Sequence, residues 1–195
     1  MEFFIGLAFN NSSIHHNKIE NFRRRYDSKF HKGQVLQLTM LPPFVYEYKN
    51  QEALFSLKEE LSDTLDTHFL GINQTPQIEF NGITFSMGKK GILSLTPKIS
   101  LDLFHCQESI MELLKDSGAK FKKNKNVTNP ILPIGRFDFS DQLESAIEMA
   151  KIEFSSPFVM DVESVILFEK TPKIWIPKFS LYEFKRENHF FFVNG

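Results

Sequence analysis

The chain has 195 residues, of which 42% are apolar and 24% are charged, and its formal net charge is −1. This composition suits a globular protein with one well-buried core, and it excludes a global electrostatic attraction to nucleic acid or to an anionic membrane. Any phosphate binding must therefore come from a local site. With one cysteine and no apolar run of about 20 residues, we expect a cytoplasmic protein without an internal disulfide or a membrane helix.

The first half of the chain alternates the apolar periodicities of strands and helices. Residues 3–9 are apolar on both faces and predict a central strand. In chain order, we expect a strand at 3–9, a helix capped within 11–13 and continuing to about Phe30, a strand at 35–41 that Pro42 and Pro43 terminate, a helix at 51–69, and strands at 77–85 and 91–99 joined by a turn.

The second half repeats this pattern in outline. We expect a helix at 101–114 ended by Gly118, a basic loop at 120–129, a strand at 131–137, a helix at 139–154, and strands at 159–168 and 174–184. The repeated order of helix, strand, helix and two strands predicts an α+β protein. It would be a single domain of two similar lobes, roughly 1–98 and 99–186, with a tail at 187–195.

Two of the predicted strands bring side chains together by their geometry. In a strand, residues i and i+2 point to one face, so Gln37 and Thr39 project together, as do Ile131 and Pro133. If the two strands lie side by side between the lobes, these four side chains converge on one cleft.

The segment from Gln37 to Phe44 resembles the first signature of the 2H phosphoesterases, the 2′-5′ RNA ligase-like family. That signature is His-x-Thr before an apolar pair and a Pro-Phe turn. Thr39, Pro43 and Phe44 match it, and Gln37 takes the position of the histidine.

The second signature is another His-x-Thr, after a proline and before an apolar-Gly/Ala-Arg stretch. Pro130, Gly135 and Arg136 match it, whereas Ile131 stands where the histidine belongs and Pro133 where the threonine belongs. The resemblance extends over nearly the whole chain in the order and spacing of its elements.

The resemblance implies a bilobal α+β fold in which two antiparallel sheets, flanked by helices, surround a central cleft. In the family, this cleft holds a phosphodiester or a 2′,3′-cyclic phosphate, and the two histidines transfer protons to and from the reacting oxygens. The amide of Gln37 does not titrate, and Ile131 has no polar group. Loss of one positioned acid or base costs about 10²–10⁴-fold in rate, so the family's chemistry is not available as written.

The leading hypothesis is therefore a catalytically degenerate protein that binds a nucleotide or an RNA end. Its relict cleft would contain Gln37, Thr39, Ile131, Pro133 and Arg136, with no catalytic residue, metal or cofactor. A polar pair on an ordinary solvated strand is the plainer interpretation of Gln37 and Thr39.

Two alternatives remain open. In one, the protein is an active phosphodiesterase for 2′,3′-cyclic phosphates, with His105 or His189 as substitute groups that reach the cleft. In the other, it is a protein-interaction scaffold whose cleft is closed by Ile131 and phenylalanine side chains.

Two basic segments and the single tryptophan complete these expectations. Arg23, Arg24 and Arg25 would fan around about 200° of a helix, which predicts a solvated face rather than one patch. The lysine-rich loop at 120–129 either overhangs the cleft and attracts phosphate or is simply a soluble loop. Trp175 is expected to be a strand residue packed against the core.

Overall fold

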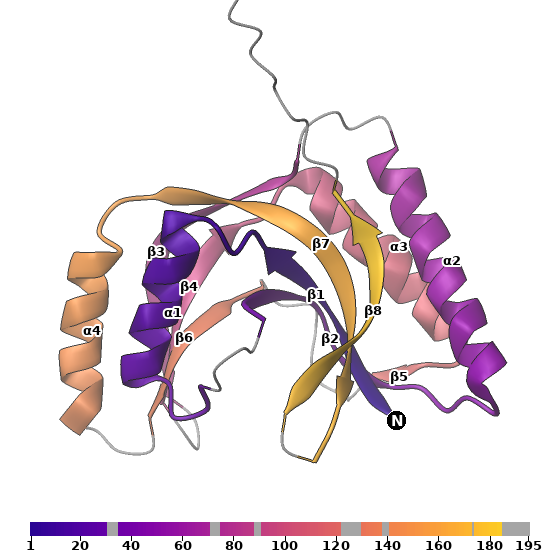
Figure 1. Cartoon of the computed structure of the whole chain (residues 1–195), viewed down its shortest axis with the longest axis horizontal. Helices are drawn as coiled ribbons and strands as arrows, with labels where there is room; N and C mark the ends of the chain where they lie inside the picture. Colours follow the sequence, from indigo (N-terminus) through magenta and orange to yellow (C-terminus); the bar gives the residue numbers. More distant parts are fainter. Residues whose placement is uncertain are drawn as a thin grey trace, which may run out of the picture.

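The computed structural model describes residues 1–30, 35–70, 75–87, 91–121, 130–137, 141–172 and 174–184. In these ranges, four helices and eight strands form an α+β protein (Figure 1). Every pairing between its named strands is antiparallel. The predicted α+β class is confirmed at this level.

The predicted helices and strands are present, with ends that differ by a few residues, and the two-residue strand β5 is additional. The turn at 88–90, most of the basic loop and the tail at 187–195 lie outside the described residues. The elements are β1 (Glu2–Phe9), α1 (Ile14–Tyr26), β2 (Gln37–Val45), α2 (Gln51–Phe69), β3 (Gln77–Met87), β4 (Gly91–Lys98), α3 (Leu101–Asp116), β5 (Lys120–Phe121), β6 (Leu132–Phe137), α4 (Asp141–Glu153), β7 (Phe158–Lys170) and β8 (Trp175–Glu183).

The strands form one continuous path in the order β5-β2-β1-β7-β3-β4-β6, and β8 also pairs with β7. The long strand β7 joins the two parts of this path. Its first residues pair with β3, and the rest pairs with β1 and β8. Strands from residues 1–98 lie on both sides of β7, together with strands from the later part of the chain.

The prediction that Pro42 and Pro43 terminate the second strand is wrong, because β2 continues to Val45. Ile5 pairs with Leu41, and the register shifts just beyond this pair. A bulge takes residues out of the regular ladder, so it accommodates prolines that have no N–H to donate.

The helices lie in two pairs at opposite ends of the curved sheet (Figure 1). Helices α1 and α4 pack beside β6, whereas α2 and α3 pack together against β8 and β2. No helix in the described ranges has the length and apolar character needed to cross a membrane.

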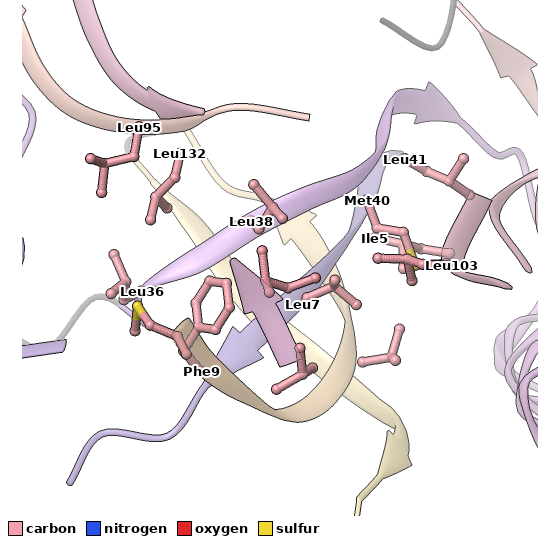
Figure 2. Packing of buried hydrophobic residues seen from close by; sticks show 14 of the residues in the cluster. Ile5, Leu7, Phe9, Leu36, Leu38, Met40, Leu41, Leu95, Leu103 and Leu132 are labelled. Carbon is pink, nitrogen blue, oxygen red and sulfur yellow. The ribbon is translucent and has the colours of Figure 1, made fainter. Parts of the chain in front are cut away.

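Most buried apolar side chains of the described residues form one connected core. Figure 2 shows part of it, with Leu7 of β1 beside its partner Leu38 of β2, and Leu95 of β4 beside its partner Leu132 of β6. Strand β1 lies between β2 and β7 and is buried throughout residues 3–9, as its apolar faces predict.

Candidate functional site

A cavity of about 150 Å³ is lined by side chains from α1, β1, β2, β6 and β8. Its polar wall consists of two guanidinium groups, an amide and a hydroxyl. Its apolar wall consists of two aromatic rings, two prolines and a leucine. The polar residues are Arg23, Gln37, Thr39 and Arg136, and the apolar residues are Phe4, Pro43, Leu132, Pro133 and Trp175.

Strand β2 presents Gln37 and Thr39 to the cavity because its side chains alternate between two faces. Leu38 and Met40, which lie between and after them, face the core. The period-2 prediction for this strand is confirmed, and Gln37 and Thr39 are half-buried at the cavity rather than fully solvated.

Beside Thr39, strand β1 contributes a residue without a side chain. Gly6 pairs with Thr39, and a Cβ atom there would lie 3.1 Å from the ring of Phe4 and 3.2 Å from the ring of Phe168. The glycine therefore leaves room for these two stacked rings next to the cavity.

From the second predicted strand, Pro133 and Arg136 line the cavity. Ile131 lies just before β6, is 40% exposed and does not line it. The structure thus brings together Gln37, Thr39, Pro133 and Arg136, and it leaves Ile131 outside. Because Ile131 faces solvent, it does not close the cavity.

The two arginines of the cavity share one carboxylate, that of Asp27. Both Asp27 oxygens accept hydrogen bonds from Nη1 of Arg136, at 3.0 and 2.7 Å. Asp27 Oδ2 lies 3.6 Å from Nε of Arg23. The Asp27 side chain is 0% exposed, so this arrangement is a buried charge cluster. Asp27 is the C-cap of α1, which ends at Tyr26, before the predicted end at Phe30.

The solvated face predicted for the three arginines is wrong for one of them. Arg24 and Arg25 are exposed, whereas Arg23 is 5% exposed. Nη1 of Arg23 donates to Glu20 at 3.0 Å, and its guanidinium lies over the ring of Phe30, 5.7 Å from the centroid. Its buried Nε has no hydrogen-bond partner among the described residues.

Aromatic rings line the same cavity as the two arginines. Trp175 contacts Phe4 edge to face, with ring centroids 4.8 Å apart, and Phe4 stacks on Phe168 at 4.6 Å. Lys170 Nζ lies 5.8 Å from the centre of the Trp175 ring. Trp175 is thus a strand residue that packs against the buried ring of Phe4, as predicted, and its half-buried side chain also lines the cavity.

The nine lining residues include two arginines and no His, Cys, Asp, Glu or Lys. His105 lies on α3 with its side chain 56% exposed and 3.4 Å from Glu108, so it does not reach the cavity. His189 is outside the described residues. Burial raises the pKa of the Cys106 thiol to about 12, which keeps it protonated.

The described residues contain no group of three or more His, Cys, Asp or Glu that could hold a metal ion. Of the predicted basic loop, Lys120 lies in β5, 3.6 Å from Glu47, and residues 122–129 are outside the described part of the chain. The guanidinium, amide and hydroxyl groups of the cavity can donate hydrogen bonds to an anion, and its aromatic rings can contact a flat ring.

No family model matches the sequence, and no curated protein matches it significantly. The geometry of the cavity and its charges therefore carries the functional argument.

Proposed function

We propose that this protein is a catalytically degenerate member of the 2H phosphoesterase type that binds a phosphate-bearing RNA end or nucleotide without cleaving it. The observation that carries the proposal is the gathering of two guanidiniums, one amide and one hydroxyl in a single cavity beside an indole ring.

The polar wall matches the acceptors of a phosphate group. Guanidiniums donate in a planar fork that fits two phosphate oxygens, and an amide N–H and a hydroxyl complete the set. The charges of Arg23 and Arg136 are opposed by Asp27 and Glu20. Because the cluster has little excess positive charge, a singly charged diester or cyclic phosphate suits it better than a doubly charged monoester.

The apolar wall can contact the base of a nucleotide. Bases stack on aromatic side chains without a requirement for sequence, at about 1–3 kcal/mol for each base. The cavity volume of about 150 Å³ is below the roughly 300–1,000 Å³ typical of sites that enclose a whole small molecule. It suits a phosphate with its adjacent sugar, while the rest of an RNA chain extends into solvent.

The arrangement of the sheet supports the comparison with the two-lobed fold of the 2H phosphoesterases. In this proposal, the lobes are not the sequence halves 1–98 and 99–186, because strands of the first half lie on both sides of β7. One lobe contains β5, β2, β1, β8 and the second part of β7, with α2 and α3. The other contains β3, β4, β6 and the start of β7, with α1 and α4. Strands β2 and β6 contact each other, and they are the strands on which the two signatures fall.

The test uses the single tryptophan of the chain, because Trp175 lines the cavity and reports occupancy through its fluorescence. Addition of uridine 2′,3′-cyclic phosphate should change this fluorescence with saturation, while uridine alone should give a weaker response. Chromatography of the incubated nucleotide should show no hydrolysis.

Two results would contradict the proposal. If the fluorescence of Trp175 does not change with saturation on addition of the cyclic phosphate, the binding function is excluded and the scaffold hypothesis is favoured. Turnover on the order of 1–10³ per second, the range of ordinary enzymes, would show that other residues perform the chemistry.

A further inference from the structure

Asp27 occupies an unfavourable position for a carboxylate. It is the C-cap of α1, directly after Tyr26, where the helix dipole opposes a negative charge, and its side chain is fully buried. Burial of an ion is costly unless it is paired and hydrogen-bonded. Its pairing with Arg136 and Arg23 therefore offsets the cost of burying this carboxylate.

A purely structural explanation would be that Asp27 fastens the end of α1 to β6. The backbone already makes this connection. Ser28 N–H donates to the carbonyl oxygen of Arg136 at 3.3 Å, and Asp27 and Arg136 form a parallel bridge. Gly135 permits the close approach, since a Cβ there would lie 3.3 Å from the carbonyl oxygen of Tyr26.

The carboxylate instead acts on the two guanidiniums. Both oxygens of Asp27 accept hydrogen bonds from Nη1 of Arg136, so the carboxylate anchors this end of the guanidinium. The same carboxylate forms an ion pair with Arg23, at 3.6 Å from its Nε and without a hydrogen bond. The N–H of Lys29 donates to Asp27 Oδ1 at 3.0 Å and holds the carboxylate in place.

We propose that Asp27 is the positioning residue of this site: its buried carboxylate holds Arg136 and Arg23 at the cavity so that both guanidiniums meet one phosphate group. This inference rests on the proposed function. It also assigns Arg23 as a phosphate-binding residue beside Arg136.

The direction of one mutational effect separates positioning from simple charge. Asp27→Asn removes a negative charge near the cavity, which by electrostatics alone would strengthen anion binding. If Asp27 orients the arginines, the loss of one acceptor oxygen should instead weaken the binding of uridine 2′,3′-cyclic phosphate, measured by Trp175 fluorescence. We expect a loss of about 10–100-fold, as when a group that orients a metal ligand is removed.

The matched control is Asp116→Asn, which removes an exposed carboxylate at the end of α3 and should leave binding unchanged. Coupling provides the second criterion. In an Arg136→Ala background, Asp27→Asn should cost at least about threefold less affinity than it does in the wild type, because residues that act together are not additive. A merely structural role would give equal costs in both backgrounds.

If Asp27→Asn does not fold, the wild-type protein still tests whether both arginines meet the ligand, through the NMR signals of its arginine Nε–Hε groups. The signals of Arg23 and Arg136 should both shift when the cyclic phosphate is added, while the signal of exposed Arg25 should not. A shift confined to Arg136, or to neither arginine, would overturn the inference.

The two proposals fail in different ways. If the wild type binds the cyclic phosphate and Asp27→Asn binds it equally well or more tightly, only the positioning role is lost. If the wild type does not bind the cyclic phosphate at all, the proposed function is lost, and the role of Asp27 is lost with it.

Discussion

Gly6 of β1 pairs with Thr39 of β2, and the missing side chain leaves room for the ring of Phe4 beside the cavity. Gly6→Ala should therefore destabilise the protein by about 1–3 kcal/mol, the usual cost of overpacking. It should also alter the fluorescence of Trp175, which contacts the displaced Phe4. Chemical denaturation followed by fluorescence measures both effects.

The control for this substitution is Gly82→Ala in β3, where an added Cβ meets nothing within 4 Å. It should leave the free energy of unfolding nearly unchanged. Equal effects at the two positions would show that the loss of stability comes from the backbone preference of glycine and not from crowding at Phe4.

Arg136→Ala should weaken the binding of uridine 2′,3′-cyclic phosphate by roughly 10–100-fold, the equivalent of one charge-assisted hydrogen bond. It should also lower the melting temperature, because Asp27 loses both of its hydrogen bonds to Nη1. Arg25→Ala is the control: Arg25 pairs with Glu153 and does not line the cavity. Similar affinities for the two variants would contradict a binding role for Arg136.

The stability of the protein should fall with acid in part because of His16. Burial is the main cause that lowers the pKa of His16 from its ordinary value of 6.5, with Arg23 acting in the same direction and Glu20 and Glu163 opposing it. The unfolded state therefore takes up the proton at a higher pH than the folded state does. This destabilising contribution is absent well above 6.5 and grows as the pH falls.

The measurement is the melting temperature of the wild type and of His16→Gln between about pH 7.5 and about pH 5. The wild type should lose more stability than the variant over this interval. Parallel curves would show that His16 has the same pKa in both states.

A restoration experiment distinguishes two alignments of the second signature. The variant Gln37→His, Ile131→His, Pro133→Thr rebuilds both His-x-Thr motifs, and it should fold because Ile131 is exposed. It should remain inactive, since position 131 does not line the cavity.

The variant Gln37→His, Pro133→His places both imidazoles at the cavity. It should hydrolyse the cyclic phosphate faster than the wild type does, because one positioned acid or base raises the rate by about 10²–10⁴-fold. Greater activity in the first variant would show that position 131 reaches the ligand.

How much of the site could be predicted from the sequence depends on whether the signal is local. Strand periodicity is local, so it correctly paired Gln37 with Thr39 at one face. Local signals also located most helices and strands, because the apolar periods and caps are contained within each segment. Ser13, for example, lies in the predicted cap and accepts from the N–H of His15.

The remaining residues of the cavity depend on contacts between distant segments. Among three consecutive arginines, only the packing of α1 against β6 selects Arg23 for burial. Asp27 has no distinguishing neighbours in the sequence, and its role arises from the approach of Arg136. Trp175 reaches the cavity through the pairing of β8 with β7. No local periodicity encodes these relationships.

The central position of β7 has a consequence for synthesis of the protein. Strand β1 emerges from the ribosome long before β7, with which it pairs in the described part of the chain and which begins only at Phe158. At about 5–20 residues per second, this delay is on the order of 10 s. During that time the nascent chain carries an apolar strand with an unpaired edge, which is a site for aggregation. We therefore expect the newly made chain to depend on chaperones until β7 has been translated.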